Sequence, residues 1–380
     1  MSQSELEEHR RYLADDRKVD AYRRALAEVV GPDDVVLDLG SGTGLLGYLA
    51  CDAGAASVVA VDVGDIVSLA RRIAADNGYA DRIRHVKAAS VAMDLDEPAD
   101  VAVCDQIGGL VHDAGVLRFF ADARRRLLAP GARLVPASFR IHAAPVTFDQ
   151  GRDAVDFWST RPAGFDVSAG RDTAANTEWR YEVDPEVVTR LAQGSELAAF
   201  AADADVPIGG TATFGVTESG RFDGYLGWFE AQMSPSVTLP NDPWSPERFG
   251  RWCNFYPLEA AVAVEPGARI ELSIDIRPRI GVISWSTRTT QADGEVVAGR
   301  QSTFGGSFLD RETVEGAVVD EPVATSADRV AALREAIDLL DGTRSATDLR
   351  AALADRVGTG FVSTEHLEMF VNDVVWLARA

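Results

Sequence analysis

Apolar and polar residues follow two different patterns along this chain of 380 residues. Up to about residue 136, short apolar runs alternate with stretches in which apolar residues recur every three or four positions, the spacing of an amphipathic helix. The runs predict strands at residues 35–39, 57–61, 84–87, 101–104 and 133–135, and the spaced stretches predict helices at residues 5–30, 45–53, 67–77 and 116–128. Strands that alternate with helices form parallel sheets with helical crossovers, so this part predicts an α/β fold.

After Pro136 the pattern changes to short segments that alternate between apolar and polar residues and are broken by glycine and proline. They predict strands at residues 139–146, 212–216, 224–232, 253–256, 269–276 and 281–286, which is typical of an antiparallel sandwich or barrel. Residues 157–193 are poorly patterned and too long for an ordinary hairpin loop, so we expect them to make a specific contact. From about residue 321 helical spacing returns and predicts helices at residues 327–340, 345–356 and 364–379.

These changes of pattern predict three domains: an α/β domain with an N-terminal helix at 1–136, an antiparallel β domain at 137–320, and a small helical module at 321–380. No apolar run approaches the roughly 18 residues of a membrane span, and the N-terminal residues lack the features of a signal peptide. The sequence therefore predicts a cytoplasmic protein without a membrane partner.

Composition narrows the possible ligands. The formal net charge of −22 opposes binding to nucleic-acid phosphates and favours the approach of cationic substrates. Three cysteines and five histidines are few and scattered, so we expect no metal site and no disulfide framework.

A glycine-rich loop between the first strand and its helix carries the clearest chemistry. Gly40, Gly42 and Gly44 let the backbone turn tightly against a ligand. The run also fits the dinucleotide pattern G-x-G-x-x-G, which predicts a pyrophosphate on the helix N-terminus. Asp38 argues against that interpretation, because a carboxylate repels pyrophosphate but suits the ammonium and sulfonium charges of S-adenosylmethionine. Asp62, at the end of the second strand, is placed for ribose hydroxyls.

Several further segments between about residues 13 and 283 occur, together with this loop, in the order in which one known family has them. They are Leu13-Ala-Asp15, Tyr22-Arg23, Val61-Asp62, Gly164-Phe-Asp-Val-Ser168, Gly227-Trp-Phe-Glu230, Val237-Thr-Leu239 and Trp252 with Phe255-Tyr-Pro-Leu258. Together they resemble the protein arginine methyltransferase family. The resemblance implies a seven-strand Rossmann-like S-adenosylmethionine domain, then an antiparallel β-barrel whose arm, at about 157–193, makes a homodimer.

The resemblance also implies the activity: S-adenosylmethionine donates a methyl group to a guanidino nitrogen of arginine, in a peptide, a protein or the free amino acid, and S-adenosylhomocysteine is the product. Family members hold the substrate guanidinium with two glutamates on one hairpin. Asp105 falls on the first glutamate, whereas Ala114 falls on the second, with Asp113 beside it. His112, in the same loop, is a candidate to complete the site or to act as a base.

Two further catalytic candidates lie in a later loop. Arg251 stands where the family has histidine, next to a matching Trp252. We expect Arg251 either to neutralise Asp105 or to bind a carboxylate of the substrate. Lys18 stands for the arginine that binds the cofactor carboxylate, and Val91 for the glutamate that holds adenine; the aromatic lid helix of the family is expected to be absent. The expected cofactor-binding residues are Lys18, Asp38, Gly40, Ser41, Gly42, Gly44, Asp62, Val63 and Val91.

Transfer to arginine is demanding because the guanidinium has a pKa above ~12, so carboxylates must orient its nitrogen and hold its charge elsewhere. Asp105 directly follows the strand at 101–104, at the edge where open parallel sheets bind ligands. The altered second position leaves other functions open: a natural-product or peptide N- or O-methyltransferase, or a catalytically silent cofactor-binding scaffold. Residues 339–345 give the C-terminal module a weak similarity to winged-helix modules, with a helical cap as the alternative.

Overall fold

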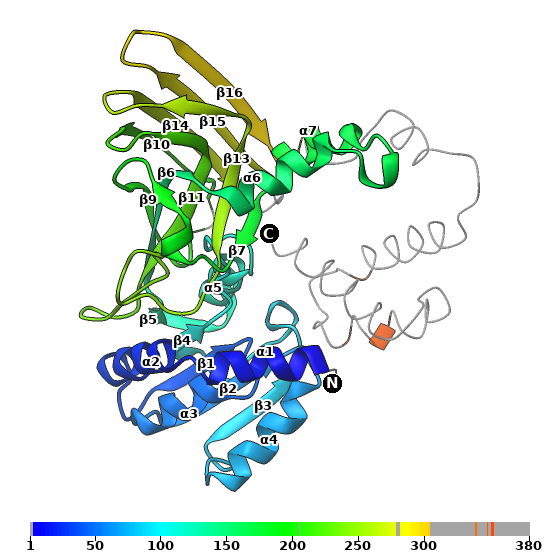
Figure 1. Ribbon diagram of the computed structural model, residues 1–380. Helices are drawn as coiled ribbons and strands as arrows, with labels where there is room; N and C mark the ends of the chain where they lie inside the picture. Colours follow the sequence, from blue (N-terminus) through cyan, green and yellow to red (C-terminus); the bar gives the residue numbers. More distant parts are fainter. Residues whose placement is uncertain are drawn as a thin grey trace.

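The computed structural model describes residues 3–204, 206–278 and 282–304, together with residues 339, 348, 351 and 352. In Figure 1 the α/β half, coloured blue to cyan, lies below an antiparallel half coloured green to gold. Apart from the four single positions, the helices expected after residue 321 lie outside the described residues.

A five-stranded parallel sheet forms the centre of the α/β half. Its strands are β1 (Val35–Leu39), β2 (Ser57–Asp62), β3 (Ile83–Lys87), β4 (Ala99–Cys104) and β5 (Leu128–Val135), in the order β3-β2-β1-β4-β5. Its helices are α2 (Asp16–Val29), α3 (Leu45–Asp52), α4 (Ile66–Asp76) and α5 (Val116–Arg126). The strand order reverses beside β1, so ligands are expected beyond the carboxyl ends of β1 and β4.

The predicted α/β-plus-barrel architecture is confirmed, with one correction: among the described residues the parallel sheet has five strands, where the resemblance implied seven. After β5 comes Pro136, which has no amide hydrogen with which to extend a ladder. The next strand, β6 (Ser138–Thr147), leaves the parallel sheet and pairs antiparallel with β9 (Ser195–Ala201) and β11 (Gly220–Gln232).

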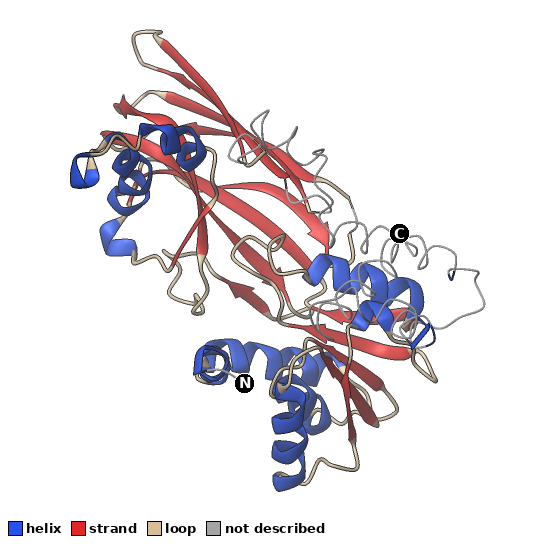
Figure 2. Ribbon diagram, turned by 90° about the vertical axis from the view of Figure 1, so that its right-hand side faces the viewer, coloured by secondary structure: helices blue, strands red, loops and turns tan. Residues whose placement is uncertain are grey.

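Two antiparallel sheets make up the other half (Figure 2). One has the order β7-β13-β11-β6-β8, with β12 on β11 and β9 on β6, and the other has the order β10-β14-β15-β16. Their remaining strands are β7 (Trp179–Tyr181), β8 (Thr189–Arg190), β10 (Ile208–Gly215), β12 (Thr238–Pro240), β13 (Cys253–Val264), β14 (Arg269–Arg277), β15 (Val282–Thr290) and β16 (Val296–Ser302).

The poorly patterned segment is a helical projection from the antiparallel half, as the positions of α6 and α7 in Figure 1 show. The helix α6 (Asp149–Asp156) leads into the segment, whose helical elements are η2 (Phe157–Ser159), η3 (Pro162–Gly164), η4 (Ser168–Gly170), α7 (Arg171–Ala175) and, beyond β7, η5 (Pro185–Val187). Phe157 and Phe165 are 50% and 74% exposed here. Exposed aromatic rings on a projecting segment are typical of a contact surface.

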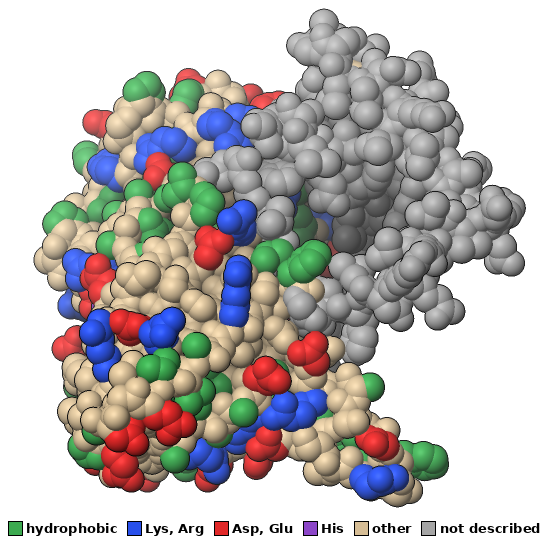
Figure 3. All heavy atoms as spheres, turned by 90° about the horizontal axis from the view of Figure 1, so that it is seen from above, with side chains coloured by type: hydrophobic (Ala, Val, Ile, Leu, Met, Phe, Trp, Pro, Cys, Tyr) green, Lys and Arg blue, Asp and Glu red, His purple; other side chains and the backbone are tan. Residues whose placement is uncertain are grey.

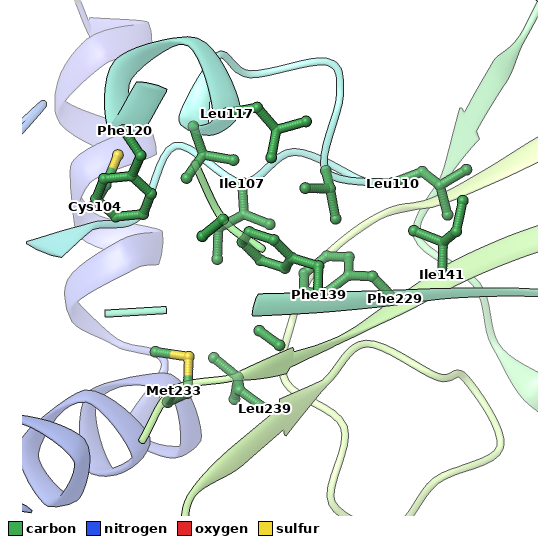
Figure 4. Packing of buried hydrophobic residues seen from close by; sticks show 14 of the residues in the cluster. Cys104, Ile107, Leu110, Leu117, Phe120, Phe139, Ile141, Phe229, Met233 and Leu239 are labelled. Carbon is green, nitrogen blue, oxygen red and sulfur yellow. The ribbon is translucent and has the colours of Figure 1, made fainter. Parts of the chain in front are cut away.

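One hydrophobic core runs through both halves (Figure 4). Ile107 and Leu110, from the loop that follows β4, pack among Phe139 and Phe229 of the antiparallel sheet. All four side chains are at most 1% exposed. The loop after Cys104 is therefore held between the two halves, and the residues beside it have fixed positions.

The N-terminal segment forms two helices, α1 (Gln3–Leu13) and α2, where one helix was predicted. Asp15 ends the first and caps the second, because its carboxylate accepts a hydrogen bond from the backbone nitrogen of Lys18 at 3.1 Å. No helix among the described residues is both long and apolar enough to span a bilayer. Acidic and basic side chains are interspersed on the described part of the face in Figure 3.

Candidate functional site

The glycine-rich loop takes the conformation that its sequence predicts. Gly40, Gly42 and Gly44 all have positive φ, at 70°, 53° and 89°, which other residues rarely adopt. Neighbouring side chains leave no room for larger residues: a Cβ atom on Gly40 would lie 2.9 Å from Gln106, and one on Gly42 would lie 3.0 Å from His9 of α1. The loop therefore lies against α1 and against the chain that follows β4.

Asp62 organises this loop. One carboxylate oxygen accepts the backbone N–H of Gly42 at 2.9 Å, and the other accepts that of Gly64 at 2.7 Å. The carboxylate thus lies at the carboxyl end of β2, directly beside the glycine turn, as predicted for a ribose-binding acid. Val63, its neighbour, is 63% exposed.

Asp38 is fully buried and only partly satisfied. Its Oδ2 atom accepts the backbone N–H of Gly47 at 3.0 Å, but its Oδ1 atom has no hydrogen-bond partner. Burial, with smaller contributions from Asp62 and Asp105, raises the pKa of Asp38 to about 7. Ser41, in the same loop, also has a buried hydroxyl without a partner. Unpaired acceptors at this turn fit a cofactor that brings positive charge and hydrogen-bond donors, such as S-adenosylmethionine.

Val91 contributes differently. It is 4% exposed and lies in the short helix η1 (Ser90–Ala92). A hydrocarbon side chain accepts no hydrogen bond from an adenine amine, so it offers an apolar wall where the family has a glutamate. Its role and that of Val63 stay predictions.

Asp105 lies between two cations at the end of β4. Lys18 Nζ lies 2.6 Å from Asp105 Oδ2, and Arg251 Nη2 lies 2.7 Å from Asp105 Oδ1. The side chains of Lys18, Asp105 and Arg251 are 4%, 17% and 7% exposed. Of the two roles predicted for Arg251, the structure shows the neutralising one. Lys18, predicted to face the cofactor carboxylate, pairs with Asp105 in this structure.

Two tyrosines that the sequence analysis did not select support this cluster. The hydroxyl of fully buried Tyr22 donates to the carbonyl oxygen of Cys104 at 2.9 Å and lies 3.4 Å from Asp105 Oδ1. Burial and the charge of Asp105 raise the pKa of Tyr22 well above its ordinary value, so it stays a proton donor. The ring of Tyr12 on α1 lies 4.5 Å from Lys18 Nζ and 5.6 Å from the guanidinium carbon of Arg251.

Helix α1 also reaches the site, since it brings His9 to the glycine loop and Tyr12 to the cations; the absence of the family's aromatic lid helix stays a prediction. Arg11, also on α1, lies 5.9 Å from the ring of Trp252. A pocket opens between α1 and the loop of Trp252. It is lined by Glu8, Arg11, Tyr12, Asp15, Lys18, Glu182, Gly250, Arg251 and Trp252.

His112 and Asp113 were predicted to complete the site, but both connect the loop that follows β4, the hairpin of the family, to the barrel. His112 Nε2 lies 3.3 Å from Glu178 Oε2, and Glu178 also accepts hydrogen bonds from Tyr256, at 2.6 Å, and from Asn254. Although burial favours the neutral imidazole, the hydrogen bond to Glu178 raises the pKa of His112. This buried ion pair fixes the hairpin rather than facing Asp105.

Asp113 makes the second tie. Its side chain is 3% exposed, pairs with Arg180 Nε at 3.1 Å and accepts the backbone N–H of Gly109 at 3.0 Å. Glu178 directly precedes β7, and Arg180 lies within it. Glu178 was not predicted from the sequence, because its partners His112 and Tyr256 are 66 and 78 residues away along the chain and no local pattern marks it.

The arrangement joins two chemical capacities. The loop of β1, with Asp38 and Asp62, offers oxygen acceptors to a cofactor with amino and hydroxyl groups. The end of β4 offers a single carboxylate, paired with Lys18 and Arg251, to a cationic acceptor. The donor and acceptor groups of a transfer reaction would meet between them.

Comparisons with known proteins agree with a cofactor loop at β1 and an acceptor site at β4. Residues 23–136 match the family model of ribosomal protein L11 methyltransferase (PrmA). An arginine N(omega)-methyltransferase of Streptomyces achromogenes subsp. streptozoticus is 29% identical over 275 residues, which cover 70% of this chain and 75% of that protein. A protein arginine N-methyltransferase 6 of Danio rerio is 31% identical over 195 residues, covering 50% of this chain and 55% of that protein.

Solved structures extend the likeness to the whole described fold. The PRMT1 enzyme–prozyme heterotetrameric complex with AdoHcy of Trypanosoma brucei aligns with a TM-score of 0.67 and 20% identity, covering 77% of this chain and 97% of that chain. The protein arginine methyltransferase 10 of Arabidopsis thaliana aligns with a TM-score of 0.67 and 18% identity, covering 78% of this chain and 98% of that chain. At this identity the likeness establishes the fold: a Rossmann-like domain followed by a barrel.

Proposed function

Because this chain belongs to the arginine methyltransferase-like family of S-adenosylmethionine-dependent methyltransferases, we propose that it methylates a guanidino nitrogen of an arginine-containing acceptor. The observation that carries the proposal is Asp105. Its carboxylate pairs with Lys18 at the carboxyl end of β4, and it falls on the first glutamate position of the family's substrate hairpin.

The residues present fit the cofactor. Asp62 would accept the ribose hydroxyls, Asp38 and the glycine loop would face the amino acid part, and Lys18 would meet its carboxylate while it keeps Asp105 in place. S-adenosylmethionine supplies an electrophilic methyl group on sulfur, and S-adenosylhomocysteine leaves. The protein contributes position, since an in-line displacement needs the two reacting atoms aligned.

Asp105 is proposed to orient the acceptor. Its carboxylate would accept hydrogen bonds from guanidinium nitrogens and hold the positive charge away from the nitrogen that attacks. Tyr22 and Lys18 keep the carboxylate in one place, and Ile107 in the shared core fixes the chain that follows it. The second family glutamate has no counterpart at Ala114, and Glu178 holds the hairpin from the opposite side.

Product analysis tests the function. The purified chain, given labelled S-adenosylmethionine and either L-arginine, an arginine peptide or host extract, should form S-adenosylhomocysteine and a product with a methyl group on a guanidino nitrogen, identified by mass spectrometry. Methylation of a different nitrogen or oxygen would favour the natural-product alternative. Cofactor binding without any S-adenosylhomocysteine would favour the silent scaffold.

We further propose a homodimer in which the projection at about 157–193 packs against a second copy. Two exposed aromatic rings on this projection, Phe157 and Phe165, support this, and Phe165 is the more exposed at 74%. Phe165→Glu should convert a dimer into a monomer in light scattering, whereas Val206→Glu, at a 57% exposed site away from the projection, should not. A dimer that survives Phe165→Glu unchanged would contradict the proposal.

We also propose that domains meet near residue 136, where the chain passes from the parallel to the antiparallel sheet. The second boundary, near residue 320, and the cytoplasmic location stay predictions from the sequence.

A further inference from the structure

Arg251 presents its own guanidinium to the acid that should receive the substrate. Nη2 lies 2.7 Å from Asp105 Oδ1 and 3.4 Å from the backbone oxygen of Asp105. The guanidinium lies 5.6 Å from the ring centre of Tyr12 and 5.4 Å from that of Phe249, and its side chain is 7% exposed. Its Nε atom is buried without a hydrogen-bond partner. An arginine of the chain thus occupies the carboxylate oxygen that an acceptor arginine needs.

The charges around Asp105 do not balance. Two buried cations, Lys18 and Arg251, share this one carboxylate. Asp15 also faces them, but its oxygens accept the backbone N–H groups of Lys18 and Gly250. Asp105 Oδ1 already receives Arg251 Nη2 and the hydroxyl of Tyr22, so an incoming guanidinium that binds this oxygen must displace Arg251. The displaced arginine is then a buried cation without its partner, which is costly unless another anion replaces Asp105.

The acceptor itself can supply that anion. The pocket beside the cluster is lined by both Arg251 and Arg11, so the far end of an acceptor whose guanidinium lies on Asp105 would meet cations. Glu8 and Glu182 are the other acids of this pocket, but Glu8 accepts from Tyr12, and Glu182 lies 3.7 Å from Arg11. An α-carboxylate is the anion that a free arginine carries at that end and that an arginine inside a peptide lacks.

We propose that Arg251 determines acceptor specificity: it yields Asp105 to the acceptor guanidinium and pairs with an α-carboxylate, so the preferred acceptor is arginine with a free carboxyl group. This inference rests on the proposed function and names the substrate class of the same site. The amino acid and a C-terminal arginine share this chemistry. Arginine within a chain and agmatine, which has the guanidino group but no carboxylate, do not.

Equilibrium binding tests the inference apart from turnover. In calorimetry with the S-adenosylhomocysteine-loaded protein, L-arginine should bind at least about tenfold more tightly than agmatine, the size of one charge-assisted hydrogen bond. In Arg251→Gln the two ligands should bind within about twofold of each other. Arg24→Gln, an exposed change on α2, should keep the wild-type ratio. The apparent KM values for methylation should follow the same order.

The outcomes distinguish a failure of the proposed specificity from a failure of the proposed methyltransferase function. Equal affinities for L-arginine and agmatine, or equal methylation of an internal arginine in a peptide, would overturn the specificity while the methyltransferase function stands. A preference for L-arginine that persists in Arg251→Gln would overturn the role of Arg251. If neither ligand binds, both this inference and arginine as acceptor fail. A peptide that ends in arginine distinguishes the two sources of the α-carboxylate. If it binds as tightly as L-arginine, C-terminal arginine is also an acceptor. If it binds as weakly as agmatine, the acceptor is the free amino acid.

Discussion

Asp105→Asn should lower kcat/KM for the arginine acceptor by about 10²- to 10⁴-fold, the range that a positioned charged group contributes to a transition state. The amide keeps the shape of the side chain but removes the charge that localises the guanidinium. Its NH₂ group would also point at Lys18 or Arg251, since each carboxylate oxygen now receives one of these cations. The affinity for S-adenosylmethionine should stay within about threefold, measured by calorimetry, because a threefold change is under 1 kcal/mol.

The same change should lower the free energy of unfolding by about 3 kcal/mol, because it leaves two buried cations without their anion. A matched control separates this effect from catalysis. Asp122 is 1% exposed and pairs with Arg125 and Arg126 on α5, so Asp122→Asn should destabilise the fold similarly yet retain turnover per folded molecule. Asp105→Glu restores the charge and should recover part of the activity. Turnover within about threefold of wild type in Asp105→Asn would remove Asp105 from the acceptor site.

The parallel sheet was predictable because its central strands β1, β2 and β4 are short apolar runs that end at a glycine or an acid. The strand at 35–39 and the helix that begins at Leu45 appear where the sequence predicts them. The last strand was predicted at 133–135 but begins at Leu128, because Ala129-Pro-Gly131, a turn signal, lies in an irregular stretch of the ladder to β4. The turn signal correctly indicated an irregular local backbone, but it did not indicate that Leu128 already pairs with β4.

The site residues that could be predicted lie in an apolar strand or directly after one, as Asp38, Asp62 and Asp105 do. It was not predictable where a side chain acts through distant partners. Glu178 follows a segment without periodicity, and only the folded barrel brings it to His112. Lys18 and Arg251 were selected one by one, but their convergence on a single carboxylate depends on how α2 and the barrel loop meet, which no local pattern records.

Asp62→Ala should weaken S-adenosylmethionine binding about 100-fold, the loss of two hydrogen bonds to a charged group at about 1.5 kcal/mol each. A carboxylate offers about four acceptor positions on its two oxygens. The structure uses one on each oxygen, for the N–H groups of Gly42 and Gly64, and leaves one on each for a ligand. Two neighbouring ribose hydroxyls match this remaining pair, and the glycine turn that should hold the rest of the cofactor is fixed by the same carboxylate.

Two comparisons make the test specific. Asp62→Asn keeps one acceptor oxygen and turns the other into a donor that faces a backbone N–H, so it should bind the cofactor nearly as poorly as Asp62→Ala. Asp65 lies three positions after Asp62 and is an exposed acid paired with Lys87. Asp65→Ala should therefore leave the dissociation constant within about twofold, less than 0.5 kcal/mol. If Asp62→Ala binds S-adenosylmethionine within threefold of wild type while its melting temperature is unchanged, the ribose lies elsewhere. The glycine turn would then hold the cofactor without this acid, and Asp38 would be the anion on which recognition depends.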